Sequence, residues 1–353
     1  MDAMGCRSAR FDLVHDRRMT DTEIPVTCAG SDSFLAVTGK PCRAIIPSPM
    51  DGSPIVEDMP AAPMPTASPS AVRAYYLRKN AEILHRYGPG PQVHFHAAVM
   101  TGGPPHDGTP AELRRRIVEG QTRYLDRCAD IWEAATVFRG RVLDIGCGLG
   151  GPAIYWAQRF GVEVTGLTIE PAQAQLAAQL ADDAGMAHLV STTVEDFTVA
   201  HPQGKFDTAV SNEAFVHMDR HAAFANASRT LPLGAYLCIE DVLLTKPEGK
   251  APADRYWTID IGPLAEYIAA AQASGFTLDR NVDVTAEGAD YWLWSIAWAD
   301  SQLAQLESED ALTEATESRL LRSIREHARM YRCITNNVYE FRALRFHKVR
   351  DLA

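Results

Sequence analysis

The chain has 353 residues, of which 46% are apolar and 22% are charged, proportions typical of a protein that buries a sizeable core. Its formal net charge is -11, the wrong sign for binding nucleic acid by neutralising phosphates, so we expect no nucleic-acid partner. No apolar run approaches the roughly 20 residues of a membrane span, and the segment MDAMGCRSARFDLVHDRR lacks the apolar centre of a signal peptide. The seven cysteines are scattered and form no CxxC pair, which argues against a disulfide framework and favours a cytoplasmic location.

Residues 1–70 differ in composition from the rest of the chain. Seven prolines fall between Pro47 and Pro69, and because each removes a backbone donor, no helix or central strand can run through this segment. Residues 1–46 show no sustained helical or strand period. We therefore predict a disordered Pro-rich extension over 1–70, with a regulatory or partner-binding tail as the alternative.

The segment 71–139 is predicted to contain two helices separated by a Gly/Pro-rich loop. Apolar and aromatic residues recur at helical spacing over 71–88, and a second helix begins at Pro110. The loop between them carries His94 and His96.

From residue 140 onward, strand-like apolar runs alternate with helix-like segments. This alternation predicts βαβ units and a parallel sheet with right-handed crossovers, an α/β fold. The C-terminal part departs from the pattern. A helix-compatible stretch covers 301–334, and residues 336–349 then alternate like a strand at the edge of the sheet.

The sharpest motif is VLDIGCGLGG at 142–151, in which Asp144 at the end of a predicted strand precedes three alternating glycines. Glycines permit positive φ and close approach of a ligand to the backbone, and such a loop lies where open α/β sheets bind ligands. Taken alone, it also fits an ordinary strand-to-helix turn or a dinucleotide fingerprint. The D-x-G-x-G-x-G form resembles motif I of the class I S-adenosylmethionine (SAM) methyltransferases.

The resemblance continues along 71–353. GLTIEPAQ at 166–173 is similar to the second motif of the branch containing cyclopropane fatty acid synthases, sterol C-methyltransferases and prenyl diphosphate C-methyltransferases, and VEDF at 194–197 matches the segment that cups the adenine. It implies a Rossmann-like, seven-stranded, mostly parallel sheet over 140–353 with an N-terminal helical cover over 71–139. The residues that the resemblance implies for SAM binding are Gln121, Asp144, Gly146, Cys147, Gly148, Gly150, Thr168, Ile169, Gln173, Glu195, Asp196, Phe197 and Asn212.

Two further segments resemble the bacterial prenyl diphosphate C-methyltransferases. AYYLRKN followed by HFHAA is similar to their YW…HHHY pattern, and VSNEAFVHMD to their WNNES segment. The resemblance implies a Mg²⁺-bound diphosphate, with Glu213 suited to hold the waters of the ion. The substrate-binding residues that it implies are Tyr75, Tyr76, His94, His96, Val210 and Trp257.

Three departures from the family patterns bear on the chemistry. Val216 precedes His217 where cyclopropane synthases carry a Glu, which disfavours cyclopropanation, and Ala97 stands where the prenyl diphosphate family has a Tyr. Glu170 replaces a Ser beside the cofactor, so we predict that it is the general base, with a ribose-binding role as the alternative. Glu170, Glu213 and His217 are therefore the predicted catalytic residues.

Two clusters of side chains admit a structural interpretation. Arginines recur at helical spacing beside glutamates and are interpreted as a solvated helix face, although they resemble a phosphate clamp; they are Arg319, Arg322, Arg325, Arg329 and Arg332. Aromatic residues are dense in the second cluster, and we expect most of them in the core and one or two at a pocket; they are Tyr256, Trp257, Trp292, Trp294 and Trp298.

The resemblance implies a SAM-dependent C-methyltransferase that methylates an alkene carbon of a prenyl diphosphate, of the geranyl or farnesyl class, through a carbocation that is then deprotonated. One alternative is an O- or N-methyltransferase of a small natural product, and another is a SAM-binding protein without transfer activity. We also expect a homo-oligomer.

Overall fold

The computed structural model describes residues 68–199, 202 and 205–352. The predicted N-terminal extension therefore lies outside the described residues, except for 68–70. These begin helix α1 (Pro69–Tyr87), in which the Ser68 hydroxyl accepts a hydrogen bond from the backbone N–H of Ala71 at 3.3 Å. A capping serine followed by proline in the first turn is a strong helix start, and it places the first ordered turn slightly before the predicted Ala71.

The centre of the molecule is a seven-stranded sheet with the order β3-β2-β1-β4-β5-β7-β6. Strands β1 to β5 are parallel, and β7 pairs antiparallel with both β5 and β6. The predicted seven-stranded, mostly parallel α/β sheet is confirmed. The strands are β1 (Arg141–Ile145), β2 (Glu163–Thr168), β3 (Val190–Val194), β4 (Thr208–Asn212), β5 (Tyr236–Leu244), β6 (Phe276–Asp283) and β7 (Tyr339–Lys348).

The position of β7 corrects one prediction. The last strand was expected at the sheet edge, but it lies between β5 and β6, and its residues 343–346 are all buried. Alternation in a sequence shows that one face is buried, but it carries no information about which strands lie on either side. The edge belongs to β6, which precedes the last two long helices.

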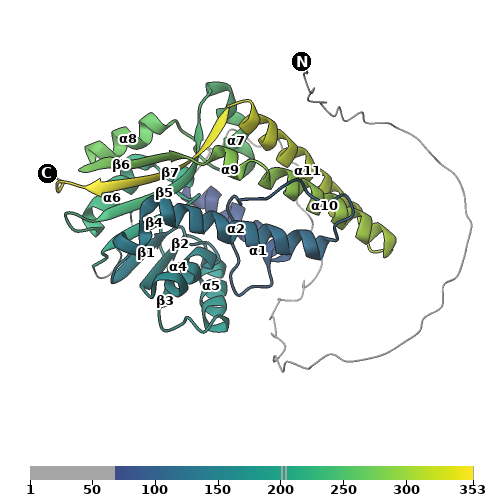
Figure 1. Ribbon diagram of the computed structural model, residues 1–353, viewed down its shortest axis with the longest axis horizontal. Coiled ribbons are helices and arrows are strands. Elements are labelled where there is room, and N and C mark those ends of the chain that lie inside the picture. Colours follow the sequence, from purple (N-terminus) through teal and green to yellow (C-terminus); the bar gives the residue numbers. More distant parts are fainter. Residues whose placement is uncertain (1–67, 200–201, 203–204, 353) are drawn as a thin grey trace, which may run out of the picture. The chain divides into compact units, whose positions relative to one another are not determined.

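Helices cover both faces of the sheet (Figure 1). Neighbouring residues of β1 point to opposite faces, so Val142 belongs to the hydrophobic cluster with α2 and α4, whereas Leu143 belongs to the cluster with α6 and α8. The remaining helices are α2 (Pro110–Trp132), α3 (Ala134–Val137), α4 (Gly151–Phe160), α5 (Pro171–Asp183), η1 (Phe215–His217), α6 (Arg220–Thr230), η2 (Pro247–Gly249), α7 (Lys250–Trp257), α8 (Leu264–Ala273), α9 (Thr285–Gly288), α10 (Tyr291–Ser308) and α11 (Glu314–Thr335).

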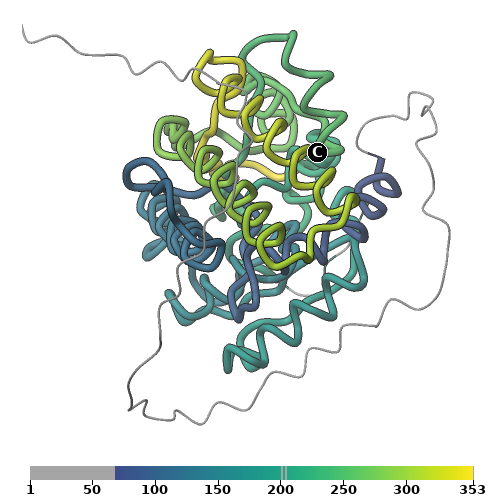
Figure 2. Tube along the Cα trace, turned by 90° about the vertical axis from the view of Figure 1, so that its right-hand side faces the viewer, coloured from purple at the N-terminus to yellow at the C-terminus, as the bar shows by residue number. Residues whose placement is uncertain are grey.

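The helix-compatible stretch over 301–334 contains the end of one helix and nearly all of the next, which form a helical hairpin. Helices α10 and α11 lie side by side in Figures 1 and 2. The chain reverses over 309–313, where Asp310 adopts a left-handed backbone (φ 53°) and the Thr313 hydroxyl caps α11. A threonine cap is a local start signal, which an apolar period read over the whole stretch conceals.

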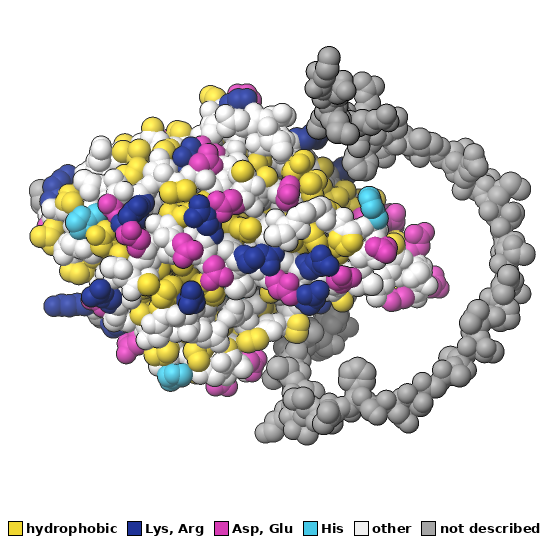
Figure 3. Space-filling model, viewed as in Figure 1, with side chains coloured by type: hydrophobic (Ala, Val, Ile, Leu, Met, Phe, Trp, Pro, Cys, Tyr) yellow, Lys and Arg dark blue, Asp and Glu magenta, His cyan; other side chains and the backbone are white. Residues whose placement is uncertain are grey.

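Acidic and basic side chains are interspersed over the face of the molecule seen in Figure 3. Exposed pairs such as Arg115–Glu119 on α2 contribute at most about 0.5 kcal/mol each. Within the described part of the chain, no helix is long and apolar enough to cross a membrane.

Candidate active site

A glycine-rich turn connects β1 to α4. Gly146, Gly148 and Gly150 have φ of 80°, 53° and 78°, values that favour glycine over any residue with a Cβ. The backbone of Gly148 lines a cavity at the carboxyl ends of the strands, and a Cβ built there would meet no atom within 4 Å. The turn therefore leaves room for a ligand directly over its backbone.

The walls of this cavity, which we call the cofactor cavity, come from the ends of β2, β3 and β4. The Thr168 hydroxyl donates to Gln173 Oε1 at 2.8 Å. Glu195 Oε2 is buried and has no hydrogen-bond partner among the residues that the structure describes, so a hydroxyl or amino donor of a ligand would satisfy it. The predicted cofactor residues that line the cavity are Gly146, Cys147, Gly148, Thr168, Ile169, Gln173, Glu195, Asp196, Phe197 and Asn212.

Three predicted cofactor residues do not line this cavity. Gln121 donates from Nε2 to the carbonyl oxygens of His94 and His96, at 3.4 and 3.0 Å, so it holds the N-terminal loop. Asp144 is 1% exposed beneath the turn, and burial raises the pKa of its carboxyl to about 7. A Cβ on Gly150 would lie 3.0 Å from the Cβ of Ala177, so this glycine permits close packing of α5.

A larger cavity of about 950 Å³, which we call the acceptor cavity, lies between α1, α7, α10 and α11. Several aromatic rings line it, more than the one or two pocket-facing rings expected; they include Tyr75, Tyr76, Tyr256, Trp257, Trp292 and Trp298. Trp294 instead donates its ring N–H to the carbonyl oxygen of Gly102 at 3.0 Å.

Two predicted substrate residues lie outside the acceptor cavity. The ring of His94 is fully buried against Gly151 at the start of α4. Val210 is fully buried in the core on β4. Both predictions assumed that the loop and the strand end present these side chains to the substrate, whereas they point into the packed interior.

The two cavities share six lining residues, so they meet at one junction; these are Tyr76, Ile83, Phe95, His96, Glu213 and His217. Glu213 has a left-handed backbone (φ 47°), an uncommon conformation for a residue with a Cβ. Its Oε1 accepts the backbone N–H of Ala97 at 2.6 Å. Burial, reinforced by the nearby carboxyl of Asp241, raises the pKa of Glu213 to about 8 despite that hydrogen bond.

His217 is held at the junction as a neutral imidazole. Its Nδ1 lies 3.0 Å from the carbonyl oxygen of Thr258, and its Nε2 lies 2.9 Å from the hydroxyl of Tyr76. A carbonyl only accepts, so Nδ1 carries the proton and Nε2 accepts from Tyr76. Burial lowers the pKa of His217 to about 4, which keeps Nε2 available as an acceptor at neutral pH.

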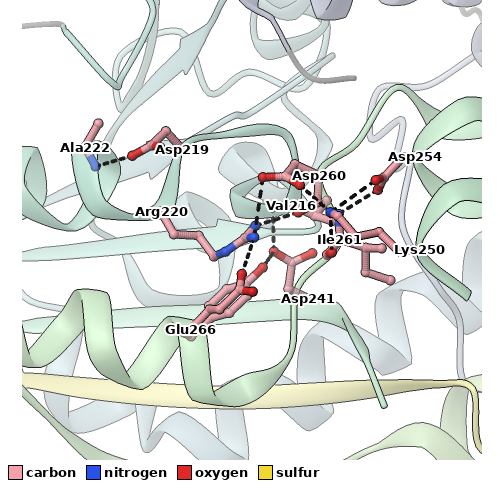
Figure 4. Close-up of polar contacts among 11 residues, drawn as sticks. Val216, Asp219, Arg220, Ala222, Asp241, Lys250, Asp254, Asp260, Ile261 and Glu266 are labelled. Atoms are coloured by element: carbon pink, nitrogen blue, oxygen red, sulfur yellow. Dashed lines mark hydrogen bonds and ion pairs between the residues drawn. The ribbon is translucent and has the colours of Figure 1, made fainter. Parts of the chain in front are cut away.

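A polar network fixes the loop that carries Glu213 and His217 (Figure 4). The backbone N–H of Val216 donates to Asp241 Oδ2 at 2.8 Å, and its carbonyl oxygen accepts the N–H of Asp260 at 2.7 Å. Arg220 and Lys250 both bind Asp260. The loop is thus held by both backbone polar groups of Val216, which keeps Glu213 and His217 in position at the junction.

Glu170, the predicted base, does not line either cavity. Its carboxylate caps α5 by accepting the backbone N–H groups of Ala172 and Gln173 at 3.1 and 2.9 Å, and it accepts Asn80 Nδ2 at 2.7 Å. The side chain is 2% exposed. A carboxylate at a helix N-terminus is stabilised by the free N–H groups there, and these draw it away from the cofactor.

The arginine strip also differs from the prediction. Arg319, Arg322 and Arg329 line the acceptor cavity, whereas Arg325 and Arg332 do not. Helical spacing shows which arginines share a face, but whether that face meets solvent or a cavity depends on the helices opposite.

Three further residues of the site, Arg86, Asn80 and Thr258, are not predicted from the sequence. Their partners lie far away in the sequence, as with the 90 residues that separate Asn80 from Glu170. The only local signal was Arg86, a charged residue at the apolar end of a predicted amphipathic helix.

Comparisons with known proteins agree with this geometry. Residues 142–234 match the family model described as "Methyltransferase domain". The chain is 31% identical to 27-O-demethylrifamycin SV methyltransferase of Amycolatopsis mediterranei over 53% of its own length and 71% of that protein. It is 27% identical to geranyl diphosphate 2-C-methyltransferase of Streptomyces lasalocidi over 59% of its own length and 70% of that protein. A geranyl diphosphate methyltransferase solved with geranyl diphosphate and sinefungin superposes with a TM-score of 0.65 at 19% identity, over 80% of this chain and 99% of that one.

The chain therefore belongs to the class I SAM-dependent methyltransferases. It spans between 7% and 59% of the length of the first four curated relatives that it matches. Relatives of both the C-methylating and the O-methylating kind occur. The acceptor and the step that follows must accordingly be argued from this chain's own residues.

Proposed function

We propose that the protein transfers a methyl group from SAM to an alkene carbon of a prenyl diphosphate of the geranyl or farnesyl class. One observation carries this proposal: the large acceptor cavity, with several aromatic rings in its walls, meets the cofactor cavity at a junction, and Glu213 is the only carboxyl group among the described residues that line both. An apolar, unsaturated acceptor fits such walls, and its methylation calls for a single base at the place of reaction.

The residues of the cofactor cavity fit SAM. Bound SAM supplies an electrophilic methyl group on a positively charged sulfur. The open backbone at Gly148 suits close contact with the cofactor, and the unpaired Glu195 Oε2 suits a hydroxyl or amino donor of its nucleoside.

The junction residues then have distinct tasks. Methylation of an alkene leaves a positive charge on the substrate, and the aromatic rings of Tyr76 and Phe95, which line both cavities, are suited to stabilise it by cation–π attraction. The substrate cation must lose a proton, and we assign its acceptance to the Glu213 carboxylate. In the protein without cofactor, burial raises the pKa of Glu213 to about 8. The positive charge of bound SAM lowers that pKa and favours the ionised base.

The described residues do not fit a resident magnesium ion. No group of three His, Cys, Asp or Glu side chains within them is arranged to hold a metal. Oε1 of Glu213, the residue expected to hold magnesium's waters, is already engaged by the N–H of Ala97. We assign no step to the metal.

Methylation of a hydroxyl group is the second candidate, favoured by the neutral His217. Its Nε2 accepts a hydrogen bond from Tyr76, so it can take the Tyr76 proton while the Tyr76 oxygen takes the proton of a bound hydroxyl. The 31% identity to 27-O-demethylrifamycin SV methyltransferase supports this reading.

The experiment that separates the two is product analysis. Labelled SAM is incubated with geranyl and farnesyl diphosphate and, in parallel, with phenolic acceptors, and each product is identified by NMR. We expect a C-methylated prenyl diphosphate. Transfer to hydroxyl acceptors alone would contradict the proposal and establish the second candidate.

The base is tested with Glu213→Gln, which keeps size but cannot take a proton. We expect turnover to fall roughly 10²-fold or more with SAM affinity within a few-fold of wild type. In wild type, kcat should rise with pH, because the base acts as the carboxylate, with a midpoint below the value of about 8 in the SAM-free protein. Glu195→Gln is the matched control: it should weaken SAM binding and leave saturated turnover nearly unchanged.

A further inference from the structure

We propose that Arg86, together with the arginines at the mouth of the acceptor cavity, binds the diphosphate of the substrate directly and without a metal. This inference rests on the proposed function and extends it by assigning the group that recognises the anionic end of the substrate.

Arg86 is a buried cation in the cavity wall without a counter-charge. It lies in the last turn of α1, is 9% exposed and lines the acceptor cavity. One guanidinium nitrogen donates to the carbonyl oxygen of Ser295 and the hydroxyl of Ser323, both at 3.3 Å, and the other lies 3.4 Å from His327 Nε2. Its Nε is buried without an acceptor, and no carboxylate among the described residues lies within 4.0 Å of the guanidinium.

All three partners of Arg86 are electrically neutral. Burial and the charge of Arg86 itself hold the pKa of His327 well below its usual range, so that imidazole is uncharged. The ring centroid of Trp298 lies 4.5 Å from the guanidinium carbon, a cation–π contact. A ring face does not neutralise the charge, and an unpaired buried ion is energetically unfavourable. An anion in the cavity would offset this cost.

Further arginines extend the positive charge to the mouth of the cavity. Four line it and have no ion pair within the described part of the chain: Arg78, Arg255, Arg319 and Arg322. Lys79 and Arg329, by contrast, pair with glutamates. In a chain with a net charge of -11, unpaired cations gathered at one cavity indicate recognition of an anion. Guanidinium groups match phosphate oxygens with paired hydrogen bonds.

The placement of these groups suits an amphiphilic substrate. Glu213 and His217 line both cavities, whereas the four arginines line only the acceptor cavity and are exposed to solvent. A prenyl chain would thus lie along the aromatic walls with its diphosphate at the arginines. Because the guanidinium groups supply the positive charge, binding of the head group needs no magnesium.

The test is calorimetric titration of the full chain with inorganic pyrophosphate in EDTA. We expect wild type to bind, and Arg86→Met to weaken binding roughly tenfold or more, the equivalent of one charge-assisted hydrogen bond. The unfolding temperature of Arg86→Met is measured alongside, because the variant also loses the hydrogen bonds to Ser295 and Ser323.

The exposed arginines of α11 can be substituted with little effect on folding, because their side chains are not buried. The double variant Arg319→Gln/Arg322→Gln should weaken pyrophosphate binding several-fold, whereas Arg325→Gln/Arg332→Gln, which removes the same charge from the same helix outside the cavity, should not. Equal weakening by both pairs, or binding that requires added magnesium, overturns the inference.

The same variants separate this inference from the proposed function. If geranyl or farnesyl diphosphate is methylated with an unchanged KM in Arg86→Met and in the Arg319/Arg322 variant, the diphosphate site is wrong and the methyl transfer stands. If only hydroxyl acceptors are methylated while pyrophosphate binding still depends on Arg86, the anion site stands and the prenyl substrate is wrong.

Discussion

Two glutamates near the cofactor cavity differ in what their surroundings let them do. Glu170 accepts three hydrogen bonds, two of them from the first turn of α5, and both of its carboxylate oxygens are engaged. Glu213 accepts one, from the N–H of Ala97, and burial raises its pKa to about 8. A carboxyl group whose pKa lies near neutral pH and which has an oxygen without a hydrogen bond is suited to proton transfer. A carboxylate whose oxygens are both hydrogen-bonded is suited to a structural role.

Substitution of Glu170 by Gln tests this division. We expect kcat at saturating SAM to stay within a few-fold of wild type, since the residue does not line either cavity. The unfolding free energy should fall by roughly 1 kcal/mol, because the charge at the helix N-terminus is lost. Steady-state kinetics and denaturant unfolding measure the two effects. A turnover loss of roughly 10²-fold would restore Glu170 as the base.

At the scale of elements, helix α1 contacts segments that follow the central strands and also contacts the helices α10 and α11 beside the acceptor cavity. Asn80 binds Glu170 at the start of α5, Tyr76 binds His217, and Arg86 binds groups on α10 and α11. These side chains follow one another along a single helix. Its position therefore depends on both sides of the site at once.

Asn80→Ala should loosen α1. The substitution removes a buried hydrogen bond to a carboxylate, 2.7 Å in length, which is worth about 1.5 to 3 kcal/mol. We expect amide hydrogen exchange along α1 to accelerate at least tenfold, and exchange in β1 to β5 to stay unchanged. Arg73→Ala, at an exposed position of the same helix, is the control. Equal exchange in Asn80→Ala and wild type would show that the contact does not hold α1 in place.

For the whole molecule, buried carboxyls link stability to pH. Burial raises the pKa of Asp144 and of Asp241 to about 7, well above the value of an unfolded aspartate, about 3.9. The folded state thus binds protons that the unfolded state has released. This contribution is complete below pH about 4 and is lost as the pH rises through 7.

We therefore expect the free energy of unfolding of the SAM-free protein to fall between pH 5 and pH 8. The Asp144 carboxyl ionises within this range in the folded protein, because its pKa is about 7. Asp144→Asn, which resembles the protonated acid, should reduce that loss by on the order of 2 kcal/mol. Denaturant unfolding at the two pH values measures the slope, and the exposed Asp182→Asn serves as the control. An identical slope in Asp144→Asn and wild type would contradict the raised pKa.

The sequence by itself determined the features that depend on local order along the chain. The glycine turn of 146–150 and the alternation of strands and helices predicted the α/β sheet, because φ preferences and apolar period act between near neighbours. The caps at Ser68 and Thr313 belong to the same class of signal. These features are present in the folded structure because each is stabilised by residues within one or two turns of the chain.

Only the tertiary structure decided which of these residues meet. Glu170 turns toward α5, β7 inserts between β5 and β6, and Arg86 reaches a histidine 241 residues away. No local pattern encodes the partner of a buried charge, since its energy depends on every group that surrounds it. The direction of a carboxylate and the ionisation of a buried group are set by packing among distant segments, and that packing exists only once the sheet, α1 and the α10–α11 hairpin have come together.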